Sequence, residues 1–199
     1  MREGPGALDL ARRISGGELG DVQLIVRPHP AHDRAEFDQD FEGLGPRIAV
    51  QRAPHAKHKV SERTQDETQI RQWVNTFRHA DVVVNTVSTV AIDAAIFDRP
   101  IVNLDYDSEP GQPNQGLVKD VNHLWSHYKP IAESGGVWLV ESPEQLVHAV
   151  RSYLADPSLH REKRRGLADY VCGFTDGRCG LRMAESVLKF ARTRRRAPA

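Results

Sequence analysis

Apolar residues recur along the chain at two spacings, and each spacing predicts one type of secondary structure. Short runs of β-branched residues, as at 81–85, are typical of strands covered on both faces. Apolar residues three and four positions apart indicate a helix, most clearly at residues 69–79, whose stripe of Ile70, Trp73, Val74 and Phe77 is predicted to pack on the sheet. Strands are predicted over residues 22–26, 47–51, 81–85, 101–104 and 137–140, and helices over 5–14, 33–44, 69–79, from the turn at 86–89 to about 97, 118–133, 142–155, 157–170 and after 178.

The order of these elements predicts the fold class. Strand and helix alternate through at least five strands, which is typical of α/β proteins. We therefore expect an open parallel sheet with helices on both faces, and a single domain over residues 1–199 that is long enough to bury its own core. The basic helix at 157–170 is expected on the surface, and residues 192–199 are expected to form a disordered basic tail.

The segment from Asp81 to Asp93 is a strand, a polar turn and the start of a helix. Its turn contains Thr86, Ser88 and Thr89, at the carboxyl end of the strand, where free N–H groups and the helix dipole favour an anion. Asp93, further along the helix, is then placed to bind a sugar hydroxyl beside a phosphate. The spacing equally fits a Ser88 that only caps the helix and an Asp93 that is solvated.

A second polar segment, Arg27-Pro28-His29-Pro30, follows the first predicted strand. The prolines restrict the backbone, so that the imidazole of His29 is held at the carboxyl edge of the sheet beside Arg27. An arginine and a histidine so placed suit a diphosphate. A loop histidine that donates to a backbone carbonyl is the alternative.

Composition excludes several classes of protein. The 27 basic and 27 acidic residues balance, which gives no field favouring nucleic acid. Two cysteines, Cys172 and Cys179, form no disulfide framework, which fits a reducing cytoplasm. No apolar run approaches the ~20 residues of a transmembrane helix, although peripheral association with a membrane stays open.

Histidines at 29, 32, 55 and 58 form two H-x-x-H pairs, which raises the question of zinc. A zinc site needs three or four ligands held by ordered elements, and no cysteine or flanking acid completes the set. We therefore predict no metal site, and expect the polar segment 53–68 to form a loop over the ligand pocket.

Taken together, these motifs resemble the donor-binding, C-terminal half of a GT-B glycosyltransferase. The nearest likeness is to CDP-glycerol glycerophosphotransferase-like and capsule polysaccharide transferases, with UDP-N-acetylglucosamine 2-epimerases as more distant relatives. The resemblance rests on an R-x-H-P motif and a small-S-S/T-x-x-x-(D/E)-A motif with its following (G/D)-(K/R)-P-(I/V). Here these are residues 27–30, Thr86 to Ala94 and Asp98 to Ile101, with weaker matches at His127 to Pro130 and at Asp176, Gly177 and Arg182.

The resemblance implies a Rossmann-like, GT-B C-terminal-domain-like fold. It also implies a metal-independent transferase domain that binds a nucleotide-sugar or CDP-polyol donor, without a cofactor, in the synthesis of surface polysaccharide or a teichoic-acid-like polymer. Arg27, His29 and the helix start are expected to hold the diphosphate, Asp93 the ribose, and His127 to lie near the nucleotide. The implied donor- and phosphate-binding residues are Arg27, His29, Thr86, Ser88, Thr89, Asp93 and His127. An epimerase-like enzyme and a non-catalytic partner subunit or truncated fragment are the alternatives.

In the resembling families a strand and a glycine-rich turn precede the first helix, and the last helix crosses to a second domain. We therefore expect residues 1–199 to lack a first strand and an N-terminal acceptor domain, which would supply the general base. The isolated chain is expected to bind its donor without turnover. We also expect it to associate with an acceptor domain or a second copy, because an unpaired strand edge promotes association.

Overall fold

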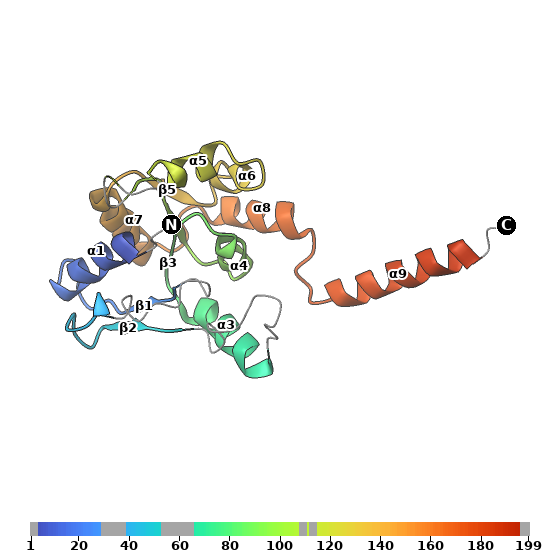
Figure 1. Ribbon diagram of the computed structural model, residues 1–199, viewed down its shortest axis with the longest axis horizontal. Coiled ribbons are helices and arrows are strands. Elements are labelled where there is room, and N and C mark those ends of the chain that lie inside the picture. Colours follow the sequence, from blue (N-terminus) through green and yellow to red (C-terminus); the bar gives the residue numbers. More distant parts are fainter. Residues whose placement is uncertain (1–3, 29–38, 53–65, 108–110, 112–114, 196–199) are drawn as a thin grey trace.

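The computed structural model describes residues 4–28, 39–52, 66–107, 111 and 115–195. Its strands form two parallel sheets, and in Figure 1 the two-stranded sheet lies below β3. The larger sheet has the order β3-β4-β5 and the smaller one pairs β1 with β2. The strands are β1 (Leu24–Val26), β2 (Ile48–Val50), β3 (Val83–Asn85), β4 (Ile101–Leu104) and β5 (Trp138–Val140). The predicted α/β class with open parallel sheets is therefore confirmed.

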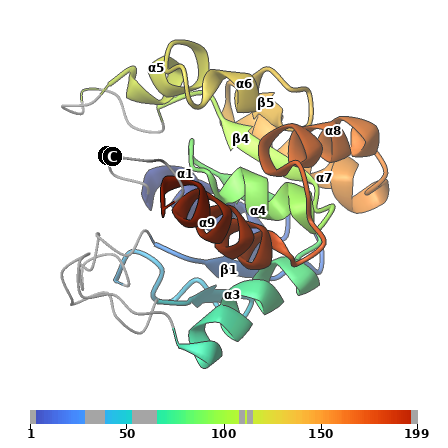
Figure 2. The same cartoon turned by 90° about the vertical axis from the view of Figure 1, so that its right-hand side faces the viewer.

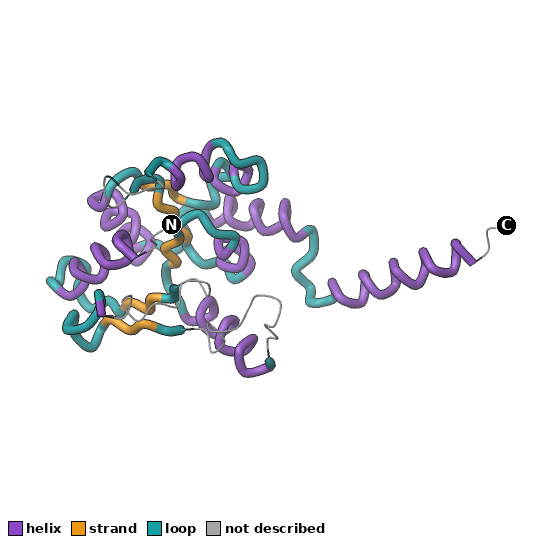
Figure 3. The backbone as a smooth tube through the Cα atoms, viewed as in Figure 1, coloured by secondary structure: helices purple, strands orange, loops and turns teal. Residues whose placement is uncertain are grey.

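Helices alternate with these strands along the chain, as Figure 3 shows by colour. They are α1 (Gly4–Ser15), α3 (Glu67–His79), α4 (Val90–Ile96), α5 (Leu117–His123), α6 (Lys129–Ala132), α7 (Pro143–Ala155), α8 (Arg161–Cys172) and α9 (Cys179–Arg195). A cap explains the start of α7: Ser142 Oγ accepts from the N–H of Gln145 at 3.2 Å, with Pro143 in the first turn. The segment 118–133 forms two short helices, α5 and α6.

Helices cover both faces of β4, all four of whose residues are buried. Val102 belongs to a core with residues of α1 and α7, such as Leu10 and Leu146. Ile101, on the opposite face, belongs to a core with residues of α4 and α8, such as Ala91 and Leu167. The side-chain alternation of a strand thus places one helical layer on each side of the sheet, and the fold is Rossmann-like.

Only part of the predicted α3 stripe is buried. Phe77 is 2% exposed and its ring lies 5.0 Å from that of Trp73 and 6.0 Å from that of Phe97. Ile70, two turns earlier, is 48% exposed. The carboxyl half of α3 reaches the core, and its amino half extends beyond it, so the prediction that the whole stripe is core was wrong for Ile70.

The basic helix α8 is not simply a surface helix, because the side chain of Arg164 is fully buried. Its Nε and Nη2 donate to Asp98 Oδ1 at 3.2 and 3.1 Å, and Nη2 also donates to the Pro157 carbonyl at 2.8 Å. Asp98 has a φ of +52° and also pairs with Arg161 at 2.9 Å. Asp98, in the Asp-Arg-Pro motif, therefore joins the end of α4 to α8.

The last helix, α9, extends away from the body of the molecule in Figure 1 and lies in front of the body in the view of Figure 2. Its apolar side is exposed, including Leu181, Val187 and Leu188 at 49–61%. The helix runs to Arg195 and so includes the first four residues of the basic segment 192–199. None of the helices in the described ranges has both the length and the apolar character needed to cross a bilayer.

Candidate functional site

The turn after β3 is fixed by a buried polar network on two neighbouring strands. Asn85 and Asn103 are directly paired in the register of β3 and β4, and their side chains are joined by a 3.2 Å hydrogen bond. The phenol oxygen of Tyr128 accepts from Asn103 Nδ2 at 2.7 Å and from Asn85 Nδ2 at 3.2 Å. It donates to the Ser88 carbonyl at 3.3 Å, and Asn85 Nδ2 donates to the same carbonyl at 2.7 Å.

This network uses the full hydrogen-bonding capacity of a neutral phenol, which has one donor and two acceptor sites. Burial raises the pKa of Tyr128 to about 12, so the phenol keeps its proton at neutral pH. Asn85 and Tyr128 therefore bond the Ser88 carbonyl directly, and Asn103 holds these two side chains in place. The network was missed in the sequence, although an asparagine ending one apolar strand and another within the next is a readable signal.

The turn held in this way is conformationally strained. Val87 has a φ of +42°, a region that β-branched residues rarely enter. Strained residues of this kind persist only where the surrounding structure imposes them, and they gather at functional sites. Ser88 Oγ accepts a long 3.4 Å bond from Val90 N, and Thr89 forms no capping bond through its side chain. Thr86 and Ser88 are half-buried, Thr89 is exposed, and α4 has only seven residues.

Asp93 lies on the first turn of α4 and is half-buried. No described residue forms a hydrogen bond or ion pair with its carboxylate, and desolvation by burial raises its pKa. A carboxylate that is partly removed from water and carries no basic partner in the described ranges is a candidate ligand-binding group.

Arg27 follows β1, and the structure places it against α3. Its Nη1 donates to Thr76 Oγ1 at 2.5 Å, and its guanidinium lies 4.8 Å from the centre of the Trp73 ring. Burial lowers the pKa of Arg27. Within the described residues Arg27 is therefore held by α3 and not joined to the Ser88 turn. His29, the other candidate of this motif, lies outside the described residues, as do both predicted histidine pairs.

The candidate His127 and its neighbour Tyr128 have opposite environments. Tyr128 is 1% exposed and supports the Ser88 turn, whereas His127 is exposed, with its ring 5.6 Å from that of Trp125. The segment containing both residues thus packs against the candidate phosphate turn through Tyr128. Within the part of the chain described, His127 itself forms no hydrogen bond to that turn.

A second polar cluster lies at the carboxyl end of β4 and was also missed in the sequence. Asp105 directly follows the strand, and its side chain is 4% exposed. Asp105 Oδ2 lies 2.8 Å from Nε2 of His123, the last residue of α5, and Oδ1 accepts from Asn122 Nδ2 at 3.0 Å. An acidic residue immediately after a buried strand was the signal, because ligands of such sheets bind beyond the carboxyl ends of the strands.

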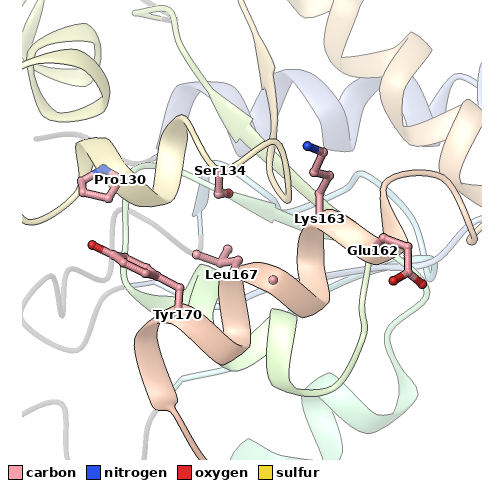
Figure 4. Close-up of a pocket in the computed structure, with 7 residues that line it drawn as sticks. Pro130, Ser134, Glu162, Lys163, Leu167 and Tyr170 are labelled. Carbon is pink, nitrogen blue, oxygen red and sulfur yellow. The ribbon is translucent and has the colours of Figure 1, made fainter.

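A surface groove of about 300 Å³ lies between α6 and α8. Its lining includes Ser134, Lys163 and Tyr170 (Figure 4), and none of the described candidate residues contributes to it. The described residues contain no group of three or more His, Cys, Asp or Glu side chains arranged to hold a metal ion.

Comparison with models of known protein families finds a match over most of the chain. The family described as CDP-Glycerol:Poly(glycerophosphate) glycerophosphotransferase matches residues 6–189, which is most of the 199-residue chain. The matched range includes every predicted site residue from Arg27 to His127. No curated protein and no solved structure matches the chain.

Proposed function

The chain belongs to the CDP-glycerol:poly(glycerophosphate) glycerophosphotransferase family, and we propose that it is the donor-binding domain of a GT-B transferase that uses CDP-glycerol. The family match carries this proposal. The α/β fold, with its polar clusters at the carboxyl ends of β3 and β4, supports it, because nucleotides bind at this edge in parallel sheets. The polymer extended would be a chain of glycerol phosphates at the cell surface.

In this proposal the diphosphate lies against the turn at Thr86, Ser88 and Thr89. The network of Asn85, Asn103 and Tyr128 fixes the backbone at Ser88 before a ligand arrives, which limits the entropy lost on binding. Hydroxyl groups at Ser88 and Thr89 supply donors for phosphate oxygens. Asp93 accepts from the ribose hydroxyls, a role suited to its half-buried carboxylate.

Arg27 supplies the positive charge. Its guanidinium has five N–H groups, and in the described ranges only one contact, with Thr76, uses them. The stacked Trp73 ring leaves the edge of the guanidinium plane available for a phosphate. His29, two residues further on, is proposed as a second phosphate ligand, and His127 as a contact of the nucleotide.

The transfer reaction then needs a stabilised leaving group. An acceptor hydroxyl attacks the β-phosphorus of CDP-glycerol, the bond from phosphorus to the bridging oxygen breaks, and cytidine monophosphate leaves. Arg27 and the turn stabilise the charge that develops on that leaving phosphate. The general base that takes the hydroxyl proton is proposed to belong to an acceptor domain.

Calorimetric titration with CDP-glycerol tests the proposed function. Arg27→Ala and His29→Ala are each expected to weaken binding, by about 1.5–3 kcal/mol for the charge-assisted arginine contact. Arg71→Ala serves as the control, since Arg71 is an exposed arginine of α3 that pairs with Glu67. Binding is expected to persist in EDTA. Equal affinities of the wild type and both site variants would contradict the site, and a stoichiometric metal whose removal abolishes binding would contradict its metal independence.

A further inference from the structure

The Asp105–His123 pair has a defined proton arrangement. A carboxylate accepts hydrogen bonds and does not donate them, so Nε2 of His123 carries the hydrogen that points to Asp105 Oδ2 at 2.8 Å. In the neutral imidazole Nδ1 is then an acceptor. The His123 side chain is 47% exposed, whereas the carboxylate behind it is 4% exposed. The pair is therefore a buried carboxylate that orients a ring accessible to a ligand.

The pair lies on the same face of the sheet as the network that holds the Ser88 turn. Asp105 N donates to the Val140 carbonyl at 2.7 Å, which continues the β4–β5 pairing beyond Leu104. Residues two apart on an extended chain face the same side, roughly 6.6 Å apart. Asn103, which bonds Tyr128, and Asp105, which bonds His123, are so related. The partner of His123 thus lies two residues beyond Asn103, toward the carboxyl edge of the sheet, where ligands bind.

A buried acceptor beside the pair lacks a donor. Asn122 is fully buried, and its Nδ2 donates both to the Leu104 carbonyl at 3.1 Å and to Asp105 Oδ1 at 3.0 Å. These two acceptors fix the orientation of the amide, because a flipped amide would bring its oxygen against the carboxylate. Asn122 Oδ1 has no partner among the described residues. The bond that Asn122 donates therefore holds the Asp105 carboxylate in place behind the exposed ring of His123.

From this geometry we propose that His123, positioned by Asp105, binds a hydroxyl of the polyol esterified to the donor's diphosphate. The hydroxyl donates to Nδ1 of His123 while the diphosphate occupies the Ser88 turn. This inference rests on the proposed function and adds to it the part of the donor that the α5 side of the site recognises. Asp105 is a positioning residue, and His123 is the residue that touches the ligand.

A structural role for His123 makes a different prediction. A protonated histidine at the last residue of α5 would interact favourably with the helix dipole. Loss of that interaction would lower the stability of the fold and weaken every ligand alike. A hydroxyl-binding role instead changes the preference between ligands that differ only in hydroxyl groups.

The experiment compares two donors of equal charge, CDP-glycerol and the CDP ester of 1-propanol, which lacks the free hydroxyls. Their dissociation constants are measured by calorimetry with the full chain. The wild type is expected to prefer CDP-glycerol by roughly tenfold, the ratio for one neutral hydrogen bond. His123→Phe and Asp105→Asn are expected to reduce that ratio toward one and to leave the affinity for the propyl ester within about twofold. His123→Gln, which keeps an acceptor, is expected to recover part of the preference.

His79→Phe is the matched control, because His79 is also an exposed histidine at the end of a helix. A His123→Phe protein that is folded by its thermal melt and retains the wild-type ratio would overturn the proposal. The same holds for a wild type that binds both esters equally. If neither ester binds to the wild type, the proposed function itself fails, and the two failures are thus distinguishable.

Discussion

The phenol oxygen of Tyr128 lies 2.7 Å from Asn103 Nδ2, and through this contact the α5–α6 connection supports the turn after β3. Tyr128→Phe would leave the buried Asn103 amide without this acceptor and the Ser88 carbonyl without one donor. We expect a loss of about 1–3 kcal/mol in the free energy of unfolding and weaker binding of CDP-glycerol, measured by urea denaturation and calorimetry.

Tyr153→Phe is the control for this substitution. Tyr153 is equally buried, and its hydroxyl pairs with His160 Nδ1 at 2.8 Å, on the α7 side of the sheet. Loss of the Tyr153 hydroxyl is expected to lower the free energy of unfolding without changing the affinity for CDP-glycerol. If Tyr128→Phe binds CDP-glycerol as tightly as the wild type does, the network does not contribute to ligand binding.

Asp98→Ala should destabilise the protein strongly. It would leave the buried Arg164 guanidinium without its carboxylate, and the loss of one partner of a buried pair costs about 3–5 kcal/mol. Asp98 is 39% exposed, so the lower end of this range is expected. Arg161→Ala removes only the more exposed pair with the same carboxylate and should cost about 0–1 kcal/mol. Similar denaturation midpoints for the two variants would contradict the claim that the Asp98–Arg164 pair stabilises the packing of α4 on α8.

Gly136→Ala is expected to displace α8. A Cβ at Gly136 would lie 2.8 Å from the Lys163 carbonyl oxygen and 3.0 Å from backbone atoms of Arg164. The neighbours are backbone atoms and cannot move as a side chain does, so we expect a loss of about 1–3 kcal/mol. Gly166→Ala, within α8, meets no atom within 4 Å and should stabilise by about 0.5–1 kcal/mol. Thermal melts compare the two variants with the wild type. A Gly136→Ala protein as stable as the wild type would refute this prediction.

Asp93 should make stability fall as pH rises through its titration. Burial raises the pKa of Asp93 above that of an exposed aspartate, so the folded state holds the proton more tightly than the unfolded state. The penalty is absent below the unfolded pKa and complete above the folded pKa. Asp93→Asn is therefore expected to be more stable than the wild type at pH 7, and the difference should shrink toward pH 3.5.

Urea denaturation across this range measures the effect, with the exposed Asp81→Asn as control. A constant difference between Asp93→Asn and the wild type at all pH values would exclude the linkage. If Asp93 also binds the ribose, the more stable variant should bind CDP-glycerol less tightly, which is the usual conflict between stability and function.

The exposed side of α9 predicts association. Leu188 and Val187 are more than half exposed on a helix that extends from the body (Figure 1), and such apolar surface promotes contact between chains. Light scattering is expected to show a mass that rises with concentration, and Leu188→Glu is expected to reduce that rise. A monomer at all concentrations would contradict the expectation that a partner domain or a second copy covers this helix.

Local patterns in the sequence determined the elements and the class of the fold. The β-branched run before Asn85 and the buried residues 101–104 specify strands, and Ser142-Pro143 specifies the start of α7, because propensity and capping act over a few residues. Alternation of these elements was enough to predict an open parallel sheet with helices on both faces, but the division of the five strands into two sheets was not predicted. The motifs at 86–94 and 98–101 carried the resemblance to glycerophosphotransferases, which the family match supports.

Only the tertiary structure decided how distant polar residues pair. Asn85 meets Asn103 and Tyr128, and Asp105 meets His123, because strand register and the path of α5 bring them together. The tertiary structure also decided that Arg164, among several basic residues in α8, is the one buried against Asp98. A local pattern shows which residue types are present at each position, but burial and hydrogen bonding depend on neighbours that lie tens of residues away in the chain.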